Sequence, residues 1–302
     1  MRKGIIMRLQ GGLGNQLFQY AAGSSVAARL GCELMFDVSL LEQTPAMATP
    51  RQFELASLVS ESRLVRLKQP NAVLTRLRTS KYKCVAEPMQ RSSRRFYEGG
   101  RGFDPRIEKT TNGTILSGYF QSFRYFERDR RSLSEKLYTP LNPSAWFREW
   151  AEVLEGTRSS VAVHVRRGDY LAQPVGSPHS PLGTDYYERS LSCVRRHVRQ
   201  PHFFVFSDDG SVDVEALGLT ECSVHVLTPP RDLPTIEALQ LMSRARTIVS
   251  ANSSFGWWAA WLGNECRQAK VYLPSPWYRN SADLGEDMRI RGSNIVKHDW
   301  IS

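Results

Sequence analysis

The chain has 302 residues, of which 41% are hydrophobic and 23% are charged. This balance is typical of a globular protein with a sizeable core and argues against a disordered or fibrous chain. The 40 Lys and Arg residues outnumber the 30 Asp and Glu residues, and the net charge of +10 indicates an anionic partner: nucleic acid, a membrane surface or a phosphate-bearing small molecule.

The N-terminal residues predict a strand followed by a helix. The apolar segment 5–9 is expected to form the strand, residues 10–15 a glycine-rich turn, and residues 16–30 the helix. Further short strands are expected at 33–36 and 114–116. This alternation favours an α/β fold.

The glycine-rich turn does not match the common nucleotide-binding patterns. It is neither a P-loop nor a complete G-x-G-x-x-G, because Leu17 stands where the last glycine would fall. A P-loop NTPase or an NAD enzyme is therefore disfavoured. Gly12 and Gly14 allow a close approach of the backbone to a ligand, and the amides of Asn15 and Gln16 are candidates to bind sugar hydroxyls or a phosphate.

Most of the net positive charge lies in residues 51–101, which carry twelve Lys or Arg and four Glu. Two interpretations are open for this segment. It is either a solvated surface or a surface that meets anionic lipid or an acidic glycan.

A second series of strands and helices follows a helix expected at 146–156. Strands are expected at 161–165, 203–206, 225–227 and 247–250, with helices at 186–198 and 235–243. The simplest architecture has two Rossmann-like domains, 1–150 and 151–302, that face a central cleft.

The strand 161–165 leads directly into Arg166, Arg167 and Asp169. Since side chains alternate along a strand, His164 and Arg166 should share one face while Arg167 points to the other. A guanidinium at the carboxyl end of a strand can chelate a diphosphate, so Arg166 is the main catalytic candidate. Asp169 is a candidate general base, although it could equally orient the two arginines. The alternative for this motif is a plain surface turn.

Two more constellations follow strand ends. Asp208 and Asp209 could bind a ribose or a purine edge, or could cap the next segment. They lack the D-x-D spacing that would hold a divalent ion, so no metal is predicted. Ser253 and Ser254 precede a helix that starts at Phe255, where they could form an anion site or serve as an N-cap. Three tryptophans of that helix are expected in the core: Trp257, Trp258 and Trp261.

The cysteines and the apolar runs indicate the cellular compartment of the protein. Five cysteines lie far apart without a C-x-x-C pair, which indicates a reducing compartment. The apolar stretch near the N-terminus ends at Met7, too short for a signal peptide, and the longest apolar run, 255–262, falls far below the ~20 residues that span a bilayer. A cytoplasmic protein is predicted, with peripheral contact at the inner face of the cytoplasmic membrane left open.

Four motifs, GGLGNQLFQYA, HVRRGDY, FVFSDD and SANSSFGWWAAWL, together resemble the bacterial α-1,2-fucosyltransferases of glycosyltransferase family eleven. The resemblance implies a GT-B type fold and an inverting, metal-independent enzyme. It implies transfer of L-fucose from GDP-β-L-fucose to the 2-hydroxyl of a terminal β-galactoside, in surface glycan or O-antigen synthesis. The first domain would lie on the acceptor side and the second would bind GDP-fucose.

The resemblance also implies a role for each candidate. Arg166 would bind the β-phosphate and assist its departure, and Asn15 and Gln16 would face the fucose. Contacts with the guanosine would come from His164, Asp208 and Asp209, and contacts with the diphosphate and base from Ser253, Ser254 and Phe255.

Two alternatives remain open at this point. One is another sugar-nucleotide-dependent transferase on the same scaffold. The other is a basic nucleic-acid-binding protein, although the sequence shows no RNP-like, zinc-knuckle or helix-turn-helix pattern.

Overall fold

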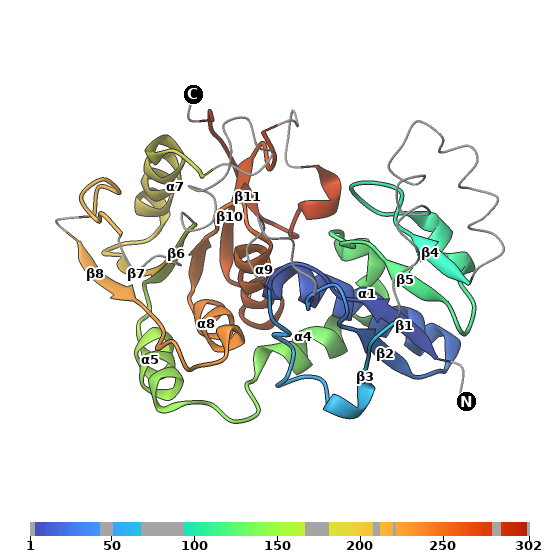
Figure 1. Ribbon diagram of the computed structural model, residues 1–302. Helices are drawn as coiled ribbons and strands as arrows, with labels where there is room; N and C mark the ends of the chain where they lie inside the picture. The colour runs from blue at the N-terminus through green and yellow to red at the C-terminus, as the bar shows by residue number, and fades with distance from the viewer. Residues whose placement is uncertain are drawn as a thin grey trace. The chain divides into compact units, whose positions relative to one another are not determined.

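The computed structural model describes residues 4–42, 51–67, 94–166, 181–207, 212–219, 222–279 and 285–300. The chain divides into two compact units, Met1–Asp129 and Arg130–Ser302. Each unit carries one sheet, and every strand pair in both sheets is parallel (Figure 1). The predicted α/β class with two Rossmann-like sheets is confirmed, whereas the central cleft stays a prediction.

Unit 1 contains a five-stranded sheet in the order β3-β2-β1-β5-β4. The strands are β1 (Ile5–Arg8), β2 (Leu34–Asp37), β3 (Leu64–Val65), β4 (Arg95–Tyr97) and β5 (Ile115–Ser117). Helix α1 (Leu13–Leu30) packs on β1 and β2, and it ends at Gly31, which adopts the left-handed conformation that suits glycine. Short 3₁₀ turns complete the unit: η1 (Glu61–Arg63), η2 (Pro105–Lys109), η3 (Phe123–Tyr125) and η4 (Glu127–Asp129).

Unit 2 contains a six-stranded sheet in the order β11-β10-β9-β6-β7-β8. Its strands are β6 (Ser160–Val165), β7 (His202–Ser207), β8 (Ser223–Leu227), β9 (Thr247–Val249), β10 (Lys270–Ser275) and β11 (Asn294–Lys297). Its helices are α4 (Arg130–Tyr138), α5 (Ala145–Gly156), α7 (Thr184–His197), α8 (Thr235–Met242) and α9 (Ser254–Arg267), with the 3₁₀ turn η5 (Glu286–Met288).

The core of unit 2 lies on both faces of its sheet. Val161, Val163 and Val165 of β6 pack with tyrosines of α7 on one face. Residues that alternate with these along the strands point to the other face, which α9 covers. Ile248 of β9 is one of them, because a Cβ on Gly263 of α9 would stand 2.5 Å from its Cδ1. In the central strand β6 every residue is buried, as expected for a strand covered on both faces.

The boundary between the units lies at residues 129 and 130. The sequence analysis placed it between residues 150 and 151, twenty-one residues later. The reason for the difference is the packing of two helices: α4 lies against α9, and α5 lies against α8. Arg130 at the start of α4 also forms a bidentate ion pair with Glu265 of α9, with Nη2 2.5 Å and Nε 3.0 Å from its carboxylate oxygens.

Most predicted elements occur close to their expected positions, and the differences are local. Helix α1 begins at Leu13 rather than at residue 16, so Gly14 and Asn15 belong to its first turn. The strands β3, β4, β10 and β11 were not predicted; the first two have two and three residues, and β10 contains Pro274. No helix in the described ranges has the length and apolar character needed to cross a membrane.

A buried ion pair ties the ends of β1 and β2 together. Arg8 Nε lies 2.8 Å from Asp37 Oδ2, and Asp37 is fully buried. Burial alone would raise the pKa of Asp37, but hydrogen bonds from the Leu67 amide, from Arg8 and from Ser39 outweigh it and hold the pKa below its usual value. Asp37 Oδ1 accepts the hydrogen bond from the Leu67 amide at 3.1 Å, so Asp37 also fixes the segment after β3 to the carboxyl end of β2.

We expect Asp37→Asn to lower the free energy of unfolding by about 3 to 5 kcal/mol at neutral pH, because it leaves the buried guanidinium of Arg8 without a compensating negative charge. Since the folded-state pKa is lowered, this stabilisation is present above the unfolded pKa of about 3.9 and is lost as the pH falls through the folded value. Urea unfolding of the wild type and of Asp37→Asn, from neutral pH down through the folded-state pKa of Asp37, tests the prediction. Glu42→Gln, which breaks the exposed pair with Arg66, is the control and should change stability little. Equal stabilities of Asp37→Asn and the wild type at pH 7 would contradict it.

Candidate functional site

The parallel pairing of β6 with β9 brings two predicted motifs to one edge of the sheet. Val163 of β6 pairs with Val249 of β9, so Arg166 and Ser253 follow the carboxyl ends of neighbouring strands. Ligands bind at this edge in open α/β sheets. His164 lies 5.5 Å from Phe255, measured between ring centroids, which places the side chain of β6 against the first turn of α9.

His164 faces α9, and its environment is tightly packed. The side chain is 3% exposed, and its backbone carbonyl accepts a hydrogen bond of 3.2 Å from the Tyr187 hydroxyl on the other face. A Cβ on Gly256 would stand 2.5 Å from His164 Nδ1 and 2.5 Å from Ser250 Oγ. Gly256 therefore lets the start of α9 approach the strand end. In the sequence Gly256 is visible as a single glycine within an apolar, aromatic run, but the side chains that it contacts in space could not be inferred.

The N-terminus of α9 has the features of an anion site. Ser253 is the N-cap residue, yet within the described chain its side chain accepts no capping hydrogen bond from the helix. The first amides of this 14-residue helix thus retain their hydrogen-bonding capacity and the positive end of the dipole. Trp257, Trp258 and Trp261 are at most 4% exposed, so their predicted place in the core is confirmed.

Several predicted site residues cannot be placed. Asp169, Asp208 and Asp209 lie outside the described residues, as do Arg167 and residues 68–93 of the basic segment. Their roles stay predictions, and so does contact of the basic segment with an anionic membrane. Among the residues that the structure does describe, no group of three or more His, Cys, Asp or Glu side chains is arranged to hold a metal ion.

The glycine-rich turn of unit 1 lies at the carboxyl end of β1. Gly11 has a φ of +77°, and Gly12 is the N-cap residue of α1. A Cβ on Gly11 would stand 2.5 Å from Asn15 Nδ2, so glycine is needed there both for the backbone and for space. Asn15 itself is half-buried, and its Oδ1 accepts a hydrogen bond of 2.7 Å from Gln121 Nε2.

The structure corrects the prediction that the Gln16 amide binds a ligand. Its side chain is fully buried, and Nε2 donates to the carbonyl oxygens of Gly11 at 2.9 Å and Gln52 at 2.7 Å. Its Oε1 accepts from the Glu54 amide at 3.0 Å. Both amide hydrogens are thus used inside the protein, so the predicted contact of Gln16 with a ligand is wrong. The residue instead holds segment 52–54 to the turn.

Residues 102–300 match the family model described as glycosyl transferase family 11. The chain belongs to glycosyltransferase family 11. The match includes the whole of unit 2 up to residue 300, and with it the strand end at Arg166 and the start of α9.

Curated relatives cover most of this family 11 chain. An α-1,2-colitosyltransferase of Escherichia coli is 29% identical over 91% of this chain and 92% of its own length. The O-antigen biosynthesis glycosyltransferase WbnK of Escherichia coli is 26% identical over 97% and 98% of the two chains. A galactoside 2-α-L-fucosyltransferase of Caenorhabditis elegans is 26% identical over 87% and 67%.

A solved structure, the fucosyltransferase NodZ from Bradyrhizobium, covers 87% of this chain and 94% of its own, at 15% identity and a TM-score of 0.47. The fold assignment of the family 11 chain rests on its own two parallel sheets.

The sequence predicts a GDP site at this sheet edge. On that prediction we expect Gly256→Ala to weaken binding of GDP by about tenfold or more, because the new methyl group forces His164 and the start of α9 apart. Titration calorimetry measures this change. Gly263→Ala is a matched control on the same helix: its methyl group would stand 2.5 Å from Ile248 Cδ1, close to the opposite end of α9. Both variants should lose thermal stability, and only Gly256→Ala should lose affinity. Unchanged GDP binding by Gly256→Ala would contradict the proposed place of the site.

Proposed function

We propose that this family 11 glycosyltransferase moves L-fucose from GDP-β-L-fucose to the 2-hydroxyl of a terminal β-galactoside, with inversion, in O-antigen or other surface glycan synthesis. The observation that carries the proposal is the juxtaposition of Arg166 with the N-terminus of α9 at one sheet edge. The names of the relatives support the sugar, the linkage and the glycan: an α-1,2-colitosyltransferase, an O-antigen glycosyltransferase and a galactoside 2-α-L-fucosyltransferase.

Arg166 would bind the diphosphate of the donor. A guanidinium matches two phosphate oxygens at once, and its positive charge remains at any physiological pH. The backbone amides at Ser253 and Ser254 would add hydrogen bonds from the positive end of the α9 dipole. Phe255 would contact the base, and His164 would contact the guanosine. Because His164 is buried against the Phe255 ring, it would also fix that ring and the helix start.

The reaction would be a single displacement. The acceptor 2-hydroxyl oxygen bonds to the anomeric carbon as the bond from that carbon to the β-phosphate oxygen breaks, and GDP leaves with the bonding electron pair. The hydroxyl proton passes to a base, for which Asp169 is our candidate. Because charge develops on the leaving diphosphate, Arg166 and α9 would stabilise the transition state without a metal. Asn15 of the glycine-rich turn would face the fucose.

A second sugar nucleotide is a candidate donor besides GDP-fucose. The relative with 29% identity transfers colitose, which is fucose without its 3-hydroxyl. A GDP-colitose transferase is therefore the second candidate, and it would use the same diphosphate site.

A donor panel tests the proposed function. We expect the purified protein to transfer fucose from GDP-fucose to lactose in the presence of EDTA, with an α-1,2 linkage by NMR. GDP-colitose, GDP-mannose and UDP-galactose complete the panel. Transfer from GDP-colitose alone would favour the second candidate. Failure with all four donors, together with salt-sensitive binding to DNA or RNA, would overturn the proposal in favour of the nucleic-acid alternative.

We expect Arg166→Ala to lower kcat by about 100- to 1000-fold, since it removes one preorganised donor to the leaving group. Circular dichroism should show an unchanged fold. Arg131→Ala provides the control, because Arg131 is an exposed arginine that pairs with Glu135 on α4, and it should retain full activity. An Arg166→Ala enzyme with ordinary kcat would exclude the proposed role of Arg166.

A further inference from the structure

The turn after β5, residues 118–121, has a conformation that needs support from its surroundings. Gly118 has a φ of +159°, and Phe120 has a φ of +53°, in the left-handed region that residues with a side chain rarely adopt. Phe120 is fully buried, stacks on Phe96 at 6.2 Å and meets Tyr125 edge-on at 5.2 Å between ring centroids. The buried ring and the unusual backbone fix the course of the turn at the carboxyl end of β5.

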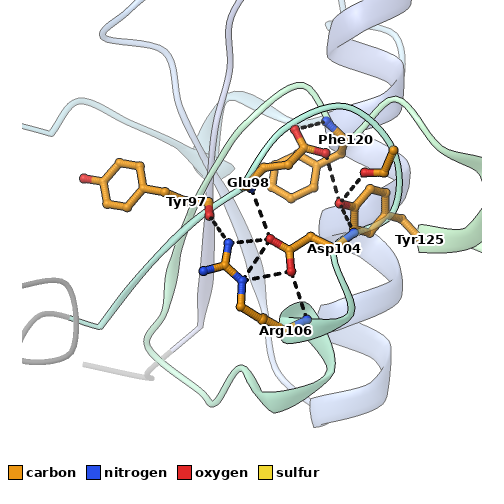
Figure 2. A network of polar contacts seen from close by, with 8 residues as sticks. Tyr97, Glu98, Asp104, Arg106, Phe120 and Tyr125 are labelled. Atoms are coloured by element: carbon orange, nitrogen blue, oxygen red, sulfur yellow. Dashed lines mark hydrogen bonds and ion pairs between the residues drawn. The ribbon is translucent and has the colours of Figure 1, made fainter. Parts of the chain in front are cut away.

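Glu98, directly after β4, holds this turn through its carboxylate. Oε2 accepts hydrogen bonds from the amides of Tyr119 at 2.8 Å and Phe120 at 2.9 Å, and Oε1 accepts from the Tyr125 hydroxyl at 3.0 Å. Figure 2 shows Glu98 between Phe120 and Tyr125. Burial raises the pKa of Glu98, against the hydrogen bonds that lower it. A Cβ on Gly118 would stand 2.6 Å from Oε2, so glycine is required for this contact.

An ion pair anchors the other side of the network. The Tyr125 hydroxyl accepts a hydrogen bond of 2.9 Å from the Asp104 amide, and the Asp104 carboxylate is held by Arg106 through Nε at 3.0 Å and Nη2 at 2.6 Å (Figure 2). The guanidinium of Arg106 holds the pKa of Asp104 below its usual value. The turn is therefore connected to a charged network as well as to the core.

Two glutamine side chains attach the same turn to the glycine-rich turn. Gln19 accepts from the Gln10 amide at 3.1 Å and donates to the Gly118 carbonyl at 3.0 Å. Gln121 donates to Asn15 Oδ1 at 2.7 Å. The second of these bonds occupies the oxygen of the Asn15 amide, so its nitrogen is left as the donor side of the group.

Tyr119 is the exposed aromatic residue that this rigid turn presents. Its side chain is 46% exposed, whereas its neighbour Phe120 is fully buried. An exposed aromatic ring on a fixed backbone loses little conformational entropy when it binds a ligand. The turn lies at the carboxyl end of a parallel sheet, and Gln121, two residues after Tyr119, contacts the asparagine that we place next to the fucose.

We propose that Tyr119 is the platform for the acceptor sugar, a terminal β-galactoside. This inference rests on the proposed function, because an acceptor hydroxyl has to lie beside the fucose that it attacks. One face of a galactopyranose ring presents C–H groups, which suit the apolar face of a tyrosine ring, while the hydroxyls at its rim suit polar neighbours such as the Asn15 amide.

The test separates acceptor binding from donor chemistry. Initial rates with lactose as acceptor give KM and kcat for the acceptor, and GDP release without acceptor gives the hydrolysis of GDP-fucose. We expect Tyr119→Ala to raise the acceptor KM about tenfold or more, and to leave the hydrolysis rate and the KM for GDP-fucose unchanged. Tyr119→Phe keeps the ring and should restore an acceptor KM close to that of the wild type.

Tyr97→Ala is the matched control, because Tyr97 is a half-buried tyrosine of β4 in the same unit and its ring points away from the Glu98 network in Figure 2. It should keep the wild-type acceptor KM. An unchanged acceptor KM in Tyr119→Ala would overturn the platform while leaving the proposed function intact. Absence of both transfer and hydrolysis in the wild type with GDP-fucose would instead overturn the proposed function.

Discussion

The parallel register between β6 and β9 is the constraint on which the candidate donor site depends. Parallel strands end at the same edge of a sheet, so Arg166 and Ser253, far apart in the sequence, follow neighbouring strand ends. The register is maintained by packing on both faces, with valines of β6 against α7 and His164 against α9. A shift by one residue would turn His164 toward the valine face and place a buried polar ring among aliphatic side chains.

Amide side chains have the corresponding role in unit 1, where Gln16 and Gln19 are buried and Gln121 is half-buried. Gln16 joins the glycine-rich turn to segment 52–54, Gln19 joins it to Gly118, and Gln121 joins it to the turn after β5. An amide group both donates and accepts hydrogen bonds, so one side chain can bond to backbone groups of two loop segments at once. An unsatisfied buried amide costs about 1 to 3 kcal/mol, so these bonds restrict the loops to one arrangement. The same bonds set the orientation of Asn15.

Part of the positive charge has a structural use rather than a role in binding anions. Arg8 is buried against Asp37, Arg130 is paired with Glu265 where unit 2 begins, and Arg106 chelates Asp104. Arg166 differs from these by its place after the central strand of unit 2, at the edge where ligands bind in open α/β sheets. The net charge alone therefore could not separate Arg166, the candidate for binding an anion, from the arginines that stabilise the fold.

The sequence by itself determined the α/β class, the strand that leads to Arg166 and the helix that follows Ser253, because apolar runs and glycine-rich turns are local signals. It also carried the motifs typical of family 11. Local signals could not separate a glutamine that binds a ligand from one that binds backbone, and so the role of Gln16 was assigned wrongly. Nor could they find Gly256, Glu98 or Tyr119, whose importance depends on neighbours from distant segments. Only the tertiary structure shows their burial and their hydrogen-bond partners, because these arise when the strand ends and the loops that follow them are brought together.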